Sequence, residues 1–191
     1  SEVINGSVHD CYNTGTIANQ SRFGGGIANI VDGDSLSLAG SNIYNCYNVA
    51  NVFGGGIVAT LNCGSVYRCY NSGYIFANGS LDCGGIVARS NGDIGFSVSN
   101  CYNTGIITQM GVGHVGGIIG CGRYGTVRLS YNIGEVINYV TSSSSILGRT
   151  GGIIGDSYGC DIINCFVLSN ISTRYLEPGA IAGYHMDTVS G

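Results

Sequence analysis

The sequence lacks lysine and tryptophan and contains a single proline. Its seven basic residues are all arginine, they are scattered along the chain, and the formal net charge is −4. Nucleic acids and anionic membranes are bound by concentrated positive charge, so neither is an expected partner. Charged residues make up only 9% of the chain, against roughly 25% in a typical soluble domain. A chain with so few charges must enclose its backbone in regular hydrogen bonding.

Long apolar runs and helical patterns are also missing. No run approaches the roughly 20 residues that a membrane-spanning helix needs, so membrane insertion is not expected. The chain contains 34 glycines in 191 residues, which argues against helices of any length. No signal peptide is visible, which suggests a mature end or an excised segment.

What the chain does contain is a repeated phrase, Cys-Tyr-Asn, preceded by a β-branched residue. Two later copies are altered: Ser130 replaces the cysteine in one, and Phe166-Val167 replaces Tyr-Asn in the other. A second phrase, Gly-Gly-Ile or a close variant, lies between successive copies and begins at Gly25, Gly55, Gly84, Gly116, Gly151 and Gly179. Successive anchors are 28 to 35 residues apart, and a step near 30 residues indicates a repeat array.

The repeat predicts the fold. Short β-prone segments surround both phrases, with glycines where the chain must turn or where backbones must approach closely. We predict an all-β fold, a right-handed parallel β-solenoid (β-helix) of about six coils, with roughly 30 residues and three short strands per coil. Residues 1–191 are expected to form one domain. Neither end shows a capping element, so we expect a segment of a longer array or a subunit that stacks end to end.

Equivalent residues of successive coils lie above one another in a solenoid, so the phrase predicts three ladders. The cysteines are expected to be small interior side chains, with disulfides between coils as an alternative. The aromatic rings are expected to stack, and the asparagines to hydrogen-bond to one another and to the corner backbone. The ladder members are Cys11, Cys46, Cys69, Cys101 and Cys165; Tyr12, Tyr47, Tyr70, Tyr102, Tyr131 and Phe166; and Asn13, Asn48, Asn71, Asn103 and Asn132.

Exposed aromatic residues give the main functional signal. Tyr44 and Tyr67 hold the same position in consecutive repeats, and Arg128 holds it two repeats later. Carbohydrate recognition requires aromatic faces for sugar rings and fixed polar groups for their hydroxyls, so these are the candidate ligand-binding residues. The alternative is that the tyrosines only cover their neighbours.

The eleven acidic residues are dispersed. Asp32 and Asp34, with Asp82 or Asp93 from later coils, form the only plausible acidic cluster. They are candidate ligands for calcium, with a solvated loop or a sugar-cleaving site as alternatives, and no other cofactor is expected. Zinc is not expected, because Cys-x-x-Cys spacing is absent. A Gly-x-Ser-x-Gly match at Ser157 occupies an ordinary turn of the repeat, so no catalytic residue is predicted.

The phrases resemble a known family. The Gly-Gly-Ile-x-Gly pattern, whose last four residues are 117–120 and 152–155, together with Cys-Tyr-Asn-x-Gly, is similar to the GLUG-motif repeat of bacterial surface proteins. That repeat also occurs in large adhesins and in non-catalytic regions of IgA-protease-type metallopeptidases. The resemblance covers nearly the whole chain and implies an extracellular, cell-surface location. The zinc-peptidase signature His-Glu-x-x-His is absent, so the resemblance carries over no catalytic residue.

The resulting hypothesis is a non-enzymatic structural or adhesive module: a stalk, a spacer or an adhesin. Its expected partners are neighbouring repeats or identical subunits end to end, with glycans as candidate ligands. Two alternatives stay open. One is a self-assembling subunit of an extracellular fibre, and the other is a carbohydrate-binding or carbohydrate-cleaving β-helix.

Overall fold

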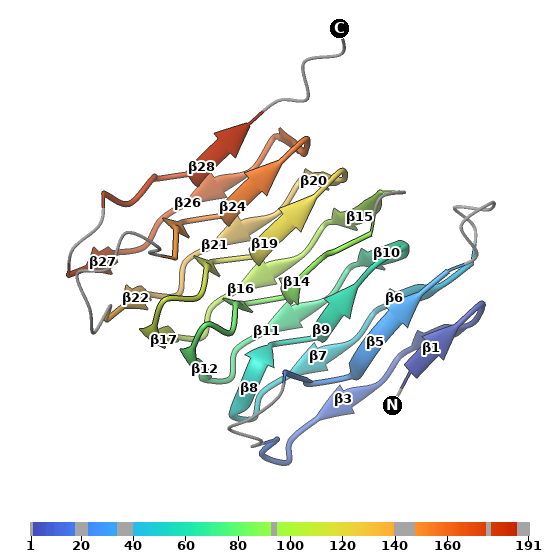
Figure 1. Cartoon of the computed structure of the whole chain (residues 1–191). Helices are drawn as coiled ribbons and strands as arrows, with labels where there is room; N and C mark the ends of the chain where they lie inside the picture. Colours follow the sequence, from blue (N-terminus) through green and yellow to red (C-terminus); the bar gives the residue numbers. More distant parts are fainter. Residues whose placement is uncertain are drawn as a thin grey trace, which may run out of the picture.

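The computed structural model describes residues 2–17, 23–33, 40–92, 95–139, 148–174 and 177–186. These residues form parallel sheets stacked as a β-solenoid without any helix (Figure 1), which confirms the predicted fold class. Two of the sheets contain six strands each, and their six rungs are separated by five full turns of about 32 residues. No helix that could cross a membrane occurs in the described ranges.

Five columns of short strands run along the solenoid. Sheet A contains β1 (Glu2–Ile4), β5 (Ala28–Asp32), β9 (Val58–Leu61), β14 (Val87–Arg89), β19 (Ile119–Arg123), β24 (Ile154–Tyr158) and β28 (Ala182–Met186). Sheet B contains β2 (Ser7–His9), β6 (Asn42–Tyr44), β10 (Gly64–Tyr67), β15 (Phe96–Ser99), β20 (Thr126–Arg128) and β25 (Asp161–Ile163). Sheet C contains β3 (Tyr12–Asn13), β7 (Tyr47–Asn48), β11 (Tyr70–Asn71), β16 (Tyr102–Asn103), β21 (Tyr131–Asn132) and β26 (Phe166–Val167).

The remaining two columns share one strand. Sheet D contains β8 (Val52–Gly55), β12 (Ile75–Gly79), β17 (Ile107–Gly111), β22 (Val136–Asn138) and β27 (Ile171–Thr173). Sheet E contains β4 (Gly24–Gly25), β13 (Cys83–Gly84), β18 (Val115–Gly116) and β23 (Thr150–Gly151), and β8 also pairs with it. A middle coil such as β14 to β18 therefore has five short strands where the sequence predicted three.

The extra strands arise from sharp bends, one of which lies within the repeated phrase. The residue before each column cysteine, or before the serine that replaces one, has a φ angle between 49° and 54°. This left-handed conformation separates sheet B from sheet C and places the bend at the same position in every copy of the phrase. The residues at this bend are Asp10, Asn45, Arg68, Asn100, Leu129 and Asn164.

The Gly-Gly phrases set the alignment of the coils. Each first glycine pairs with the first glycine of the next coil, from Gly25 with Gly55 through to Gly151 with Gly179. The predicted repeat phase is therefore confirmed. Inside the middle coils, the isoleucines that follow these glycines pack with the β-branched residues of sheet B, and both sets are fully buried there, whereas Val8, Ile27 and Ile162 in the outer coils are only partly buried.

The asparagine ladder runs through the interior beside sheet C. Each Asn side-chain amide donates from Nδ2 to the Oδ1 atom of the next asparagine, at 2.7 to 2.8 Å, from Asn13 as far as Asn132. Asn132 donates instead to the Ser169 hydroxyl, at 3.0 Å. Asn103 illustrates the remaining bonds, because it also donates to the Gly105 carbonyl and accepts from the Gly105 N–H. Each inner amide thus ties two coils together and closes its own turn.

The aromatic ladder lies on the outside of sheet C. Its six rings stack in sequence from Tyr12 to Phe166, with centroids 4.8 to 5.2 Å apart and planes within 8° of parallel. Aromatic pairs of this kind contribute about 0.5 to 1.5 kcal/mol each beyond burial of area. The stack stabilises neighbouring coils against one another.

The five cysteines of the column are free thiols, so the disulfide alternative is not realised. Each thiol contacts the backbone carbonyl two residues earlier, for example Cys101 Sγ at 3.3 Å from the Ser99 oxygen. Ser130 makes the same contact through its hydroxyl, at 2.9 Å from the Arg128 oxygen, which explains why serine fits this position. The adjacent Cys101 thiol and burial raise the pKa of Cys69 to about 12, so its thiol is protonated at neutral pH.

The bend offers a stabilising substitution. Leu129 has a φ of 49°, which is in the left-handed region that leucine rarely adopts. It is also 50% exposed, so half of its apolar surface stays in solvent. Asparagine tolerates the left-handed region better than other side-chain-bearing residues, so we expect Leu129→Asn to raise the free energy of unfolding by about 0.5 to 1 kcal/mol. Urea titration followed by circular dichroism measures the change. The reverse substitution at an equivalent position, Asn100→Leu, should lower stability; equal stability of both variants would contradict this account.

Candidate functional site

The candidate binding residues lie on the outside of sheet B, next to the aromatic ladder. Tyr44 and Tyr67 are in register in β6 and β10, and their rings stack with centroids 4.9 Å apart. His9 extends the stack on the other side of Tyr44, at 4.7 Å. Ser99 and then Arg128 occupy the same position in β15 and β20. The structure therefore brings Tyr44 and Tyr67 into contact and places Arg128 two coils away from Tyr67.

This stacking changes how the rings can be used. A ring that stacks on a neighbour at both faces presents only its edge and its hydroxyl to solvent. The inner rings of the sheet C ladder, and Tyr44 between His9 and Tyr67, are in this situation. Tyr44 therefore has no free face on which a sugar ring could stack, and ligand binding by Tyr44 and Tyr67 stays a prediction. Tyr67 differs, because Ser99 follows it.

Of the four acidic residues in the expected cluster, the structure describes Asp32 and Asp82. Asp32 ends β5, where its backbone oxygen accepts a hydrogen bond from the Ser41 hydroxyl at 2.6 Å. Asp34 and Asp93 lie outside the described residues. Asp82 instead faces Arg89, as described below. Within the described ranges, no group of three or more histidine, cysteine or acidic residues could hold a metal ion. Calcium binding at Asp32 and Asp34 stays a prediction.

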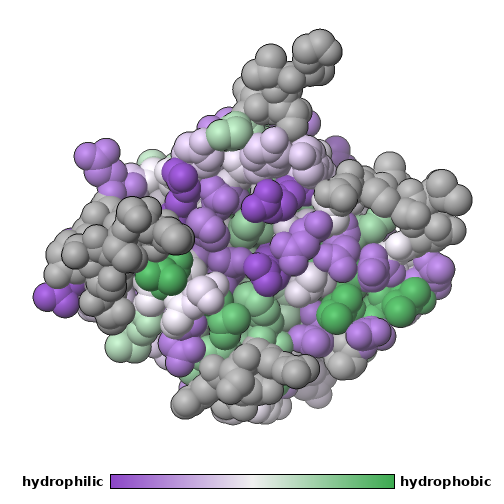
Figure 2. Space-filling model, viewed as in Figure 1, coloured by the Kyte–Doolittle hydropathy of each residue, from purple (hydrophilic) through white to green (hydrophobic). Residues whose placement is uncertain are grey.

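A charged cluster that the sequence argument missed joins three successive coils. Asp82 accepts a hydrogen bond from the backbone N–H of His114, at 2.9 Å, and its second oxygen lies 3.4 Å from Arg89 Nε. Asp156 lies 3.3 Å from Arg149 Nε and 3.8 Å from His114 Nε2. Arg89 and Asp156 lie in β14 and β24 of sheet A. The middle of the face shown in Figure 2 is mostly hydrophilic.

The electrostatics of the cluster indicate a closed network. Asp82 is only 3% exposed, and burial raises the pKa of its carboxyl group, whereas the His114 N–H, His114 and Arg89 act in the opposite direction. The guanidinium group of Arg149 also covers the Tyr184 ring, at 3.5 Å from its centroid. Each acid therefore has a basic partner within the cluster. The ion pairs join neighbouring coils, and neither carboxylate is left unpaired for a substrate.

The sequence did contain a signal for this cluster. Asp82, His114 and Arg149 each stand two residues before the first glycine of a Gly-Gly phrase. Arg89 and Asp156 each stand five residues after such a glycine. Reading the charged residues by repeat position, instead of by sequence distance, would have placed all five together.

Ser157 lies in β24, a strand, and not at a nucleophile elbow. Its side chain is fully buried, and its hydroxyl is 3.0 Å from His185 Nδ1. A nucleophilic serine must reach its substrate from an exposed turn. The sequence predicted a turn at Ser157, and that prediction is wrong, because the residue is buried within a strand that recurs in the repeat.

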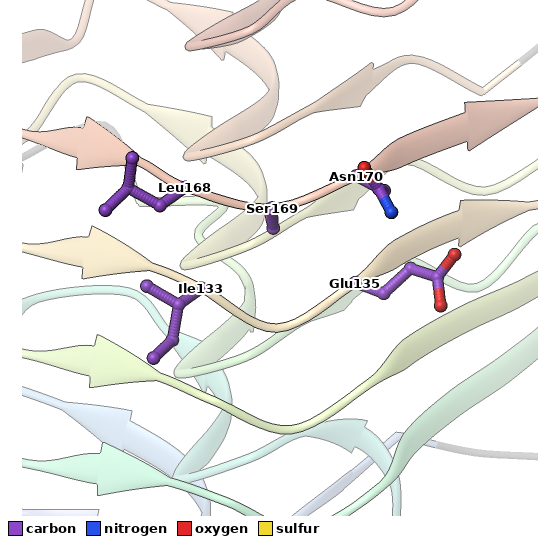
Figure 3. Close-up of a pocket in the computed structure, with 5 residues that line it drawn as sticks. All are labelled: Ile133, Glu135, Leu168, Ser169 and Asn170. Atoms are coloured by element: carbon purple, nitrogen blue, oxygen red, sulfur yellow. The ribbon is translucent and has the colours of Figure 1, made fainter.

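A depression lies where sheet C leads into sheet D in the last two coils (Figure 3). It has a volume of about 350 Å³ and is lined by Ile133, Glu135, Leu168, Ser169 and Asn170. In Figure 3, Glu135 and Asn170 lie beside each other on adjacent coils, and Ile133 and Leu168 do the same. Glu135 is the only carboxylate in this lining, whereas most glycoside hydrolases use a pair.

Comparisons with known proteins found no matching family model, no curated protein and no solved structure with significant similarity.

Proposed function

We propose that this chain is a non-enzymatic structural and adhesive repeat module that acts at a cell surface as a stalk, spacer or adhesin. The observation that carries the proposal is the pair of aromatic columns on sheets B and C. They cover the outside of one corner of the solenoid over successive coils. Such a strip of aromatic edges and hydroxyl groups suits an extended polymer better than a single small molecule.

Two further observations support this function. The Asn, Tyr and Cys columns repeat in nearly every coil, which gives a regular rod whose length is set by the number of repeats. The charged cluster around Asp82 is internally paired, so it does not supply the free carboxylates that sugar cleavage requires. The resemblance of the two repeated phrases to GLUG-motif repeats favours the same role and a location outside the cell.

The test is a glycan array probed with the whole chain at physiological salt, with and without calcium. We expect reproducible binding to one class of glycan, reduced by Tyr67→Ala. The matched control is Tyr139→Ala, because Tyr139 is 51% exposed and follows sheet D instead of sheet B. An array without any binding would overturn the adhesive role and favour a spacer or a fibre subunit. Binding that appears only with calcium would direct attention to Asp32 and Asp34.

A further inference from the structure

The depression between sheets C and D follows the repeated turn that joins them. In every copy of the phrase a small residue, glycine, alanine or serine, stands two places after the asparagine position, with one residue on each side of it. In the last two coils these flanking residues are Ile133 and Leu168 on the sheet C side, and Glu135 and Asn170 on the sheet D side (Figure 3). The depression therefore lies between two walls, each built from two adjacent coils.

The wall on the sheet C side is apolar. Ile133 and Leu168 are 45% and 74% exposed. They stand two residues after Tyr131 and Phe166, whose stacked rings end the aromatic ladder. Alternate residues point to the same side of an extended chain, so the wall continues the outer surface of the ladder. An apolar surface that ends in a depression suits a ligand with both an apolar face and polar groups.

The opposite wall is polar and carries an unbalanced negative charge. Glu135 is half-buried, and the ion pairs of the described ranges are made by Asp10, Asp82 and Asp156 instead. The described residues that line the depression include no arginine or histidine. Asn170, beside Glu135 on the next coil, adds an exposed amide that can both donate and accept. A carboxylate without a basic partner, in a chain of net charge −4, favours a positively charged ligand.

We propose that this depression binds one protonated amino sugar, a glucosamine-type unit of a cationic polysaccharide. The ammonium group pairs with the Glu135 carboxylate, and a neighbouring sugar hydroxyl bonds to the Asn170 amide. The C–H face of the sugar ring lies against Ile133 and Leu168. A lysine side chain carries the same charge but has no hydroxyl group for Asn170, so the sugar uses more of the site. The inference rests on the proposed adhesive function and adds a second binding site with a defined ligand class.

The size of the depression agrees with one sugar unit. Its volume of about 350 Å³ lies at the lower end of the range of about 300 to 1,000 Å³ for small-molecule sites. The remaining units of a polysaccharide would lie outside the depression, where the exposed rings of Tyr131 and Phe166 continue the apolar surface.

The experiment is isothermal titration calorimetry of the whole chain with a glucosamine oligomer, at a mildly acidic pH at which the amines are protonated. The comparison is the uncharged N-acetylglucosamine oligomer of the same length. We expect the charged oligomer to bind at least about fivefold more tightly, and Glu135→Gln to remove this difference. Glu2→Gln is the matched control, because it makes the same change at an exposed position in β1 and should leave the affinity unchanged.

Leu168→Ala tests the apolar wall. It should weaken binding of the glucosamine oligomer about threefold, because part of the apolar contact is lost. Met110→Ala is the control, since Met110 is an exposed apolar residue of β17, away from the depression, and its removal should not change binding. Identical binding by the wild-type protein and Leu168→Ala would overturn the placement of the sugar ring.

The outcomes separate the alternatives. Equal losses for Glu135→Gln and Glu2→Gln would show a response to net charge alone and would overturn the site. A lysine oligomer that binds as tightly as the sugar, with the same dependence on Glu135, would overturn the sugar in favour of a lysine-bearing protein. If the array shows glycan binding but the glucosamine oligomer does not bind, only this inference fails. An array without any binding overturns the adhesive function itself.

Discussion

Gly117→Ala is expected to lower the melting temperature by about 10 °C or to prevent folding. A Cβ atom at Gly117 would lie 2.0 Å from the Gly152 carbonyl oxygen of the next coil and 2.5 Å from Asn132 Cγ. Overpacking usually costs about 1 to 3 kcal/mol, and this contact is with backbone, which cannot rotate away. A loss of about 3 kcal/mol corresponds to a shift of roughly 6 to 12 °C for a chain of this size.

Thermal unfolding followed by circular dichroism measures this effect. The matched control is Gly15→Ala, where the nearest atom to an added Cβ is Asn13 Oδ1, at 3.7 Å. We expect that variant to unfold like the wild-type protein. If both variants melt together, the coils are less tightly spaced at the Gly-Gly phrase than the structure indicates.

The second large effect is expected at the centre of the asparagine ladder. Asn103→Ala removes the acceptor for Asn71 Nδ2, the donor to Asn132 Oδ1 and both bonds to Gly105. All of these groups are buried, and each buried polar group left without a partner costs about 1 to 3 kcal/mol. We expect a total loss of about 3 to 6 kcal/mol, measured by urea titration.

Asn13→Ala is the appropriate comparison, because Asn13 occupies the same column but is only partly buried. It donates to Asn48 and accepts from the Gly15 N–H, and water can replace these bonds more easily. A loss near 1 kcal/mol is expected there. Equal losses for both variants would show that burial of the amides is not what makes the ladder stabilising.

The sequence predicted the fold well because the repeat acts as an internal alignment. Positions that share a phrase, such as Tyr70 and Tyr102, must share a column once the step is known, and they pair in register. The number of strands per coil could not be obtained in this way. It depends on backbone angles at residues such as Arg68 and Leu129, whose types do not indicate a left-handed conformation.

The candidate site was predicted less completely for a different reason. Sequence position shows that Tyr44 and Tyr67 share a column, but ring orientation decides whether a face or an edge meets the solvent. That orientation follows from the spacing of the coils, which brings the rings within stacking distance. The charged cluster was missed because Asp82 and Asp156 are far apart in sequence and join only through His114 in the coil between them.

The direction of the asparagine hydrogen bonds gives the solenoid an electrical polarity. Every amide from Asn13 to Asn103 donates toward the following coil, and every amide from Asn48 to Asn132 accepts from the preceding one. The side-chain dipoles therefore add head to tail along the axis, and each polarises the next in a surrounding of low dielectric constant. A repeat inserted into the solenoid would continue this chain of hydrogen bonds only if its asparagine donated in the same direction. The ladder therefore favours one orientation of an added coil over the opposite orientation.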